Sequence, residues 1–87
     1  MVLKNNDDGY SDAAKVEGAE DRGNVIVLRC LTEKRQRKVT VLLMPQAKEL
    51  VKVGDRIVLG YCDGYDDIVL AISQDGRILP LFPTVSE

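Results

Sequence analysis

The sequence predicts an all-β fold, a small barrel built from five short strands. Apolar segments alternate with polar turns at intervals of about 8–12 residues, which is typical of small barrels and sandwiches. The chain of 87 residues holds one Phe, three Tyr and no Trp, so its core must consist mainly of Val, Ile and Leu. These branched residues suit a pleated sheet, and a chain of this length forms one small domain.

The clearest pair of strands lies within residues 53–70. A Val-Gly-Asp turn leads into an apolar segment, a polar turn follows, and a second apolar segment returns. We expect Gly54 to allow a tight reversal and Asp55 to hydrogen-bond the local backbone. Gln74-Asp75-Gly76 predicts a further hairpin turn. The expected strands are Val25–Leu31, Lys38–Met44, Arg56–Cys62, Ile68–Ser73 and Arg77–Phe82.

The connections between these strands indicate the type of barrel. Thr32–Arg37 is expected to form a charged hairpin loop, and Pro45–Val51 either one helical turn or a plain connection. Pro80 and Pro83 place the last strand at an edge or in an extended tail. A longer connection after the early strands, followed by a meander, fits an OB-like barrel best, and an SH3-like barrel is the alternative topology.

Residues 1–22 are predicted to be a flexible acidic N-terminal arm, and residues 23–87 the barrel domain. Six acidic and three basic residues give the first 23 residues a net charge of −3, whereas the whole chain carries −2. A polar, acidic segment without sustained periodicity is typical of disorder. The nearly neutral remainder argues against a protein that coats DNA through phosphate neutralisation.

Several strands are apolar on both faces. A monomeric barrel has to bury only one face of its sheet, so the second face is expected to be covered by another subunit or by the N-terminal arm. Scattered exposed Val and Leu residues are also common on ordinary surfaces, and this alternative stays open. The residues expected at an interface between copies are Leu42, Met44, Val58 and Val69.

The sequence offers no candidate catalytic site, cofactor site or metal site. The chain contains no His, the commonest general base and zinc ligand. Asp63, Asp66 and Asp67 suit a hairpin turn better than a cation site. Cys30 and Cys62 lie in apolar segments and are expected to be buried, although a disulfide between neighbouring strands is an alternative. An enzyme is therefore not expected.

No apolar run approaches the roughly 20 residues of a membrane-spanning helix, and no signal peptide is visible. The protein is therefore expected in the cytoplasm or as part of a virion or tail assembly.

The first hairpin loop carries the one basic cluster, which consists of Lys34, Arg35, Arg37 and Lys38. In OB-folds such loops contact nucleic acid, and Tyr61 is the nearest candidate for base stacking. A solvated hairpin tip, or a patch that binds an acidic protein surface, fits the cluster better than a nucleic-acid site does. Glu20 and Asp21 in the arm of a neighbouring copy would provide such a surface.

Residues 23–73 resemble the OB-fold domain of bacteriophage baseplate spikes and of the related type VI secretion spike proteins. The resemblance is carried by Gly23-Asn24-Val25, Arg37-Lys38-Val39-Thr40-Val41 up to Pro45, Val53-Gly54-Asp55-Arg56-Ile57, Gly60-Tyr61, Asp63-Gly64-Tyr65-Asp66 and Ile68-Val69-Leu70. It implies a structural domain without catalytic residues that assembles as a trimer around an axis. The family's downstream β-helical spike is absent, which implies a stand-alone adaptor.

The sequence thus predicts a non-enzymatic structural protein, a small OB-like barrel in a multi-subunit particle such as a phage tail, baseplate or other virion component. Its expected partners are further copies of itself and other structural proteins. The alternative function is a nucleic-acid-binding OB module that uses the basic hairpin loop.

Overall fold

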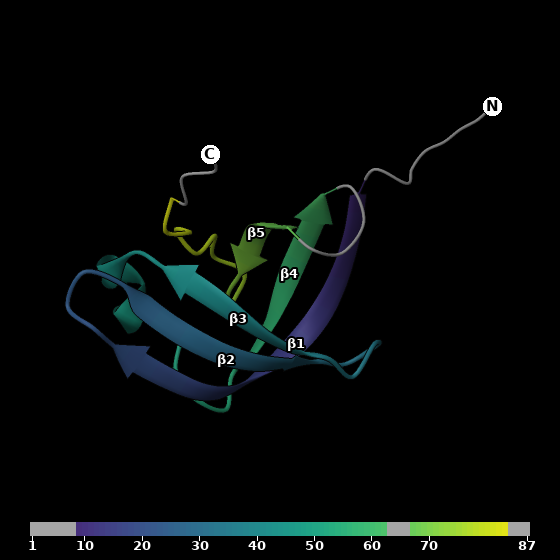
Figure 1. Cartoon of the computed structure of the whole chain (residues 1–87), viewed down its shortest axis with the longest axis horizontal. Coiled ribbons are helices and arrows are strands. Elements are labelled where there is room, and N and C mark those ends of the chain that lie inside the picture. The colour runs from purple at the N-terminus through teal and green to yellow at the C-terminus, as the bar shows by residue number, and fades with distance from the viewer. Residues whose placement is uncertain (1–8, 63–66, 84–87) are drawn as a thin grey trace.

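The computed structural model describes residues 9–62 and 67–83, which form one strongly curled antiparallel sheet of five strands (Figure 1). A short 3-10 helix lies between the third and fourth strands. The elements are β1 (Gly9–Asp21), β2 (Ile26–Thr32), β3 (Lys38–Leu43), η2 (Pro45–Glu49), β4 (Arg56–Cys62) and β5 (Asp67–Ile72). Within these ranges, no helix has the length and apolar character needed to span a membrane.

The order of strands across the sheet is β3-β2-β1-β4-β5. Strands β1, β2 and β3 follow one another as a meander, and β4 then returns beside β1, which is the Greek-key connection. The predicted fold class is confirmed: the curled sheet is consistent with a small OB-like or SH3-like barrel. Its Greek-key order is the one found in OB barrels.

The expected flexible arm is wrong for residues 9–21, because these residues form β1, the central strand of the sheet. The first half of β1 pairs with β4, from Gly9 opposite Cys62 to Lys15 opposite Arg56. Its second half pairs with β2 up to Asp21. A β-bulge at Glu17 shifts the register between the two halves and bends the strand. Residues 1–8 of the expected arm lie outside the described residues.

The C-terminal segment 77–82, expected as a fifth strand, instead forms isolated bridges to both edges of the sheet. On one side the Leu79 amide donates to the Ala71 carbonyl of β5 (2.7 Å). On the other side the Met44 amide donates to the Pro80 carbonyl, and Leu81 lies opposite Leu43 of β3. The segment therefore joins β5 to β3 and closes one part of the barrel (Figure 1).

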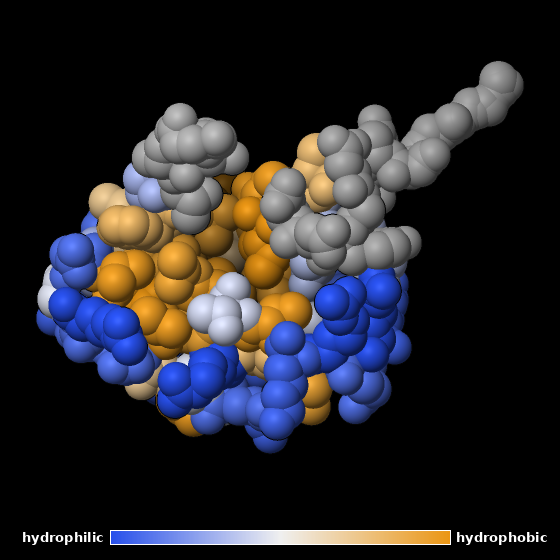
Figure 2. Space-filling view, viewed as in Figure 1, coloured by the Kyte–Doolittle hydropathy of each residue, from blue (hydrophilic) through white to orange (hydrophobic). Residues whose placement is uncertain are grey.

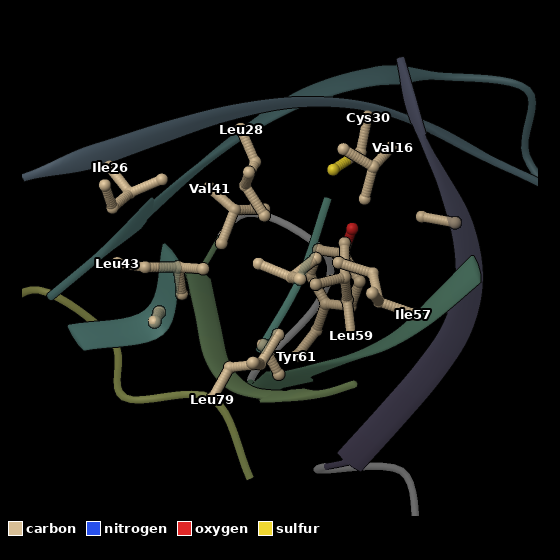
Figure 3. Close-up of a cluster of buried hydrophobic side chains, with 14 residues drawn as sticks. Val16, Ile26, Leu28, Cys30, Val41, Leu43, Ile57, Leu59, Tyr61 and Leu79 are labelled. Carbon is tan, nitrogen blue, oxygen red and sulfur yellow. The ribbon is translucent and has the colours of Figure 1, made fainter. Parts of the chain in front are cut away.

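Aliphatic side chains from all the strands, most of them branched, fill the centre of the barrel, as predicted (Figure 3). Leu28, Leu43, Ile57, Leu59 and Leu79 are among the largest fully buried side chains. In β1 the buried apolar positions hold the smaller residues Ala14 and Val16 instead.

The predicted turns are present. Gly54 and Gly76 adopt φ values of 99° and 91°, which a residue with a side chain rarely adopts. The Asp55 carboxylate accepts the Lys52 amide at 3.1 Å, as expected for a side chain that closes a tight reversal.

Deletion of residues 9–21 should abolish folding, because β2 and β4 would lose the only strand that lies between them. We expect the deletion variant to show no cooperative thermal unfolding by far-UV circular dichroism. The control is a variant with Glu20→Lys and Asp21→Lys. Both residues are exposed, and surface ion pairs contribute about 0–1 kcal/mol, so this variant should unfold cooperatively. A cooperative transition in the deletion variant would contradict the role of β1.

Candidate functional site

The basic hairpin, residues 33–37 with Lys38, protrudes at one end of the sheet. It joins β2 to β3, so it is the loop between the second and third strands and not between the first two, as the sequence suggested. Lys34, Arg35, Arg37 and Lys38 are all exposed there. In the space-filling view, hydrophilic side chains gather at this end of the molecule, on the right (Figure 2).

Strand β1 holds the basic hairpin in place by accepting hydrogen bonds from the backbone amides of the hairpin. The Glu33 amide donates to the Ala13 carbonyl at 2.8 Å. The Lys34 amide donates to Asp12 Oδ1 at 3.1 Å. The buried Thr32 hydroxyl accepts the Arg37 amide at 3.0 Å and closes the loop. The cations are therefore carried by a preorganised turn.

An ion pair attaches the basic hairpin to β4 as well. Arg56 donates from Nε and Nη2 to the two carboxylate oxygens of Glu33, at 2.7 and 3.0 Å. This hydrogen-bonded pairing lowers the pKa of Glu33 and raises the pKa of Arg56. Both side chains are exposed, so the pair fixes the geometry of the hairpin more than it stabilises the fold.

A pair of tyrosines lies beside the basic hairpin. The rings of Tyr10 and Tyr61 are 6.0 Å apart between centroids and tilted by 50°. The Lys34 ammonium lies 5.5 Å from the centroid of the Tyr10 ring, within the range of a cation–π interaction. Burial raises the pKa of Tyr61, the Asp12 charge raises it further, and Arg37 and Arg35 lower it. Tyr61 is only 6% exposed, so of these two rings only the half-buried Tyr10 offers surface for stacking.

Asp12 is 2% exposed, and its Oδ2 atom has no hydrogen-bond partner among the described residues. Burying a carboxylate oxygen without a hydrogen bond costs free energy. The other oxygen of the same carboxylate, Oδ1, accepts the Lys34 amide and so fixes the basic hairpin. Tyr10 and Asp12 were not among the expected site residues. Both fall at every second position before Ala14 and Val16, so they continue the run of inward-facing positions of β1.

The four expected interface residues differ in exposure and lie on or beside three different strands. Val58 and Val69 are exposed at 36% and 55%, whereas Leu42 and Met44 are half-buried on β3 and next to it. In the sheet, β3 is separated from β4 by β2 and β1.

The structure places a different apolar set on the outer face of the sheet. Val58 lies opposite Ala13 on one side and opposite Ile72 on the other, and Ile72 lies opposite Ile78. Residues that face each other across a sheet share a face. We call Ala13, Val58, Ile72 and Ile78 the outer apolar row. Leu70 lies next to it and covers Gly60, where a Cβ would meet the Leu70 Cβ at 3.1 Å.

The expected acidic partners of the basic hairpin lie elsewhere. Glu20 pairs with Arg22 at 3.1 Å and approaches Arg29 at 4.0 Å, and Asp21 lies 3.8 Å from Lys48. These contacts are within one chain and at the far end of β1 from Asp12.

The described residues include no cluster of His, Cys, Asp or Glu that could hold a metal ion. Asp63 and Asp66 of the expected turn lie outside the described residues. A hollow of about 290 Å³ is lined by side chains of both charges around Lys48, Asp55 and Asp75. This mixed lining selects no ligand class.

Both thiols are free, and β1 separates the strands that carry them, so Cys30 and Cys62 are not on neighbouring strands. Burial, and to a lesser degree the charge of Glu17, raises the pKa of Cys30 to about 11.

No family model, no curated protein and no solved structure matches this chain. The resemblance to spike OB domains therefore stays a prediction.

Cys30 should resist thiol reagents in the folded protein, since the reactive thiolate is both buried and disfavoured. In a Cys62→Ser variant at pH 8, we expect Ellman's reagent to react with the remaining thiol at least about a hundredfold more slowly than in denaturant. The matched Cys30→Ser variant should react faster in the native state, because Cys62 is half-buried. Equal native rates in the two variants would contradict this arrangement.

Proposed function

We propose that the protein is a non-enzymatic assembly protein, a rigid OB-like barrel that associates with further copies of itself and with other structural proteins in a multi-subunit particle. The outer apolar row carries this proposal. Val58 and Leu70 are 36% and 39% exposed and Ile78 is 69% exposed. Single exposed apolar residues are ordinary, but a contiguous row on one face favours a protein contact.

The spike resemblance supports the same function and favours a trimer in a phage tail, baseplate or other virion component. The barrel supplies a rigid body, and the outer apolar row supplies the contact between copies. The acidic clamp that the sequence suggested is not part of the proposal, because Glu20 and Asp21 belong to the central strand and pair within the chain.

The mass in solution tests self-association. We expect light scattering after size exclusion to give a multiple of the 9.6 kDa chain mass. A Val58→Lys variant should dissociate at concentrations where the wild type is assembled, because association would bury an unpaired charge. We expect the dissociation constant to rise at least tenfold, equivalent to about 1.4 kcal/mol.

Val53→Lys is the matched control, because Val53 is 55% exposed at a turn away from the outer apolar row. It should leave the mass unchanged. A monomeric wild type, or an equal effect of both substitutions, would contradict the proposed interface.

A second candidate function, binding of single-stranded nucleic acid, is favoured by the basic hairpin itself. Its loop is preorganised, and Lys34 lies over the Tyr10 ring. Phosphate contacts by Lys and Arg give salt-dependent affinity. Since Tyr61 is buried, stacking contributes little on the described surface, and the binding would be mainly electrostatic.

This function predicts that the affinity for a labelled oligothymidylate falls with salt, with a logarithmic slope of about −0.7 per phosphate contact. Alanine at Lys34, Arg35, Arg37 and Lys38 together should remove that slope. Alanine at Lys48 and Lys52, which lie outside the hairpin, should change it little. Absence of binding at 20 mM salt would exclude the function.

A further inference from the structure

In the described part of the chain, the barrel is open along one seam, between the first half of β3 and the first half of β5. Among the described residues, the C-terminal segment hydrogen-bonds to Leu42 and Met44 at the end of β3, and to Ala71 and Ser73 at the end of β5. In the space-filling view, hydrophobic side chains occupy the middle of this face, in the region between β3 and β5 (Figure 2). Among the described residues, none pairs with the edge of β3 before Leu42.

The register identifies the unpaired backbone groups of β3. The Leu42 carbonyl accepts the Phe82 amide, and the Met44 amide donates to Pro80, so even-numbered residues direct their amide and carbonyl to this edge. Backbone groups alternate in direction along a strand. The amide and carbonyl of Thr40 therefore face the seam, and they have no partner in the described part of the chain.

Both edges of the seam suit the same strand direction. The bridges of the C-terminal segment to β3 and to β5 are both antiparallel, so β3 and β5 run parallel to each other across the seam. An extended segment that runs in the direction of residues 77–82 would therefore be antiparallel to both edges. Antiparallel pairing is the commoner and slightly more stable kind.

The side chains along the seam fit an amphipathic strand. Val39 and Ile68 are half-buried and pack against the core cluster, so an apolar side chain could cover them. At the other end, Arg37 and Lys38 are exposed, and no described carboxylate lies within ion-pair distance of either. A carboxylate placed there would meet two cations.

We propose that the seam binds an extended segment of another protein, which adds a strand antiparallel to β3. The segment pairs with the Thr40 amide and carbonyl, buries apolar side chains over Val39 and Ile68, and places acidic residues near its C-terminal end beside Arg37 and Lys38. Strand addition of this kind takes its affinity from the backbone and its specificity from alternate side chains. The inference rests on the proposed assembly function and names the chemistry of one partner.

An occupied backbone carbonyl and like charges both disfavour a second copy of the same chain in the seam. Antiparallel pairing of two β3 edges centred on Thr40 would place Lys38 opposite Leu42, whose carbonyl is already bonded to Phe82. A shift of register away from Phe82 would bring Lys38 and Arg37 of both copies together. Like charges that face each other across a sheet are destabilising.

The test uses a fluorescein-labelled peptide of the sequence Thr-Val-Thr-Val-Thr-Val-Glu-Glu, titrated with the full chain and followed by anisotropy. A Thr40→Pro variant removes the edge amide but leaves the bonds of β3 to β2, because that amide points away from β2. Thr40→Val keeps the amide and is the matched control. Thermal unfolding checks that both variants are folded.

We expect saturable binding to the wild type and to Thr40→Val, and a dissociation constant at least tenfold higher for Thr40→Pro. A peptide ending in two lysines should bind at least tenfold more weakly. Equal binding by Thr40→Pro, or no binding of the acidic peptide at 1 mM protein, would overturn the proposal.

Amide hydrogen exchange gives an independent readout at one atom. The Thr40 amide should exchange freely in the wild type alone and become protected when the peptide is bound. Protection in the free monomer would show that the chain's own residues cover the seam and would overturn the proposal. So would a loss of self-association in Thr40→Pro, which would place a second copy there.

The Val58→Lys variant separates this inference from the proposed self-association. That substitution lies on the outer apolar row, away from Thr40, and peptide binding should be unchanged. Peptide binding by a wild-type monomer would support the seam and contradict self-association.

Discussion

The architecture depends on one strand that serves both halves of the sheet. Around Ala14 and Lys15, β1 pairs with β2 on one side and with β4 on the other. Straight continuation would carry the strand away from one of these neighbours. The bulge at Glu17 bends it instead, and the Val16 amide and carbonyl bond to Asp55 and Gly54 at 2.9 and 2.8 Å. These bonds join the turn before β4 to the middle of β1, so the curl of the sheet and the position of β4 are set together.

The same strand, β1, also fixes the backbone of the basic hairpin. Its loop is bonded to Asp12 and Ala13, which belong to the half of β1 that pairs with β4. The Glu33–Arg56 pair extends this attachment to the start of β4. The side chains of an isolated hairpin lose conformational freedom when they bind a partner. Here the fold has already fixed the backbone that carries the cations, so a partner has less to order.

Much of the sheet could be predicted from local patterns. The third expected strand matches β4 residue for residue, and Gly54 and Gly76 form the predicted turns. The prediction of a flexible arm is wrong because the inward and outward positions of β1 do not alternate between large apolar and polar residues. Its inward positions hold Asp12, Ala14 and Val16, while its outward positions hold Lys15 and Glu17. Large neighbours such as Leu28, Ile57 and Leu59 leave little room at the crowded centre, so the strand that crosses it carries small side chains and reads as polar.

The outer apolar row could be predicted only in part, because the face on which a residue lies depends on the register of its strand. The pattern of its own strand predicts the outward position of Val58, whereas Ile72 and Ile78 join it only through strand pairings that the sequence does not specify. In the same way, the clustering of Lys34, Tyr10 and Asp12 needs a contact between residues more than 20 positions apart. Local periodicity carries no information on such contacts.

The outer apolar row is uncharged, whereas the basic hairpin and the seam beside it carry cations. Contacts through these two surfaces should therefore respond differently to salt. The outer apolar row excludes water without charge, so contacts through it should depend little on salt. The basic hairpin and the seam beside it attract anions, and at about 0.15 M salt that attraction is screened beyond roughly 8 Å. A nucleic acid would be held mainly by the cations and would be released by moderate salt. An acidic strand in the seam would also form backbone hydrogen bonds and bury apolar side chains, so a salt-independent part of its affinity should persist. The residual affinity at high salt therefore reports on the backbone edge of β3, and the part that salt removes reports on Arg37 and Lys38.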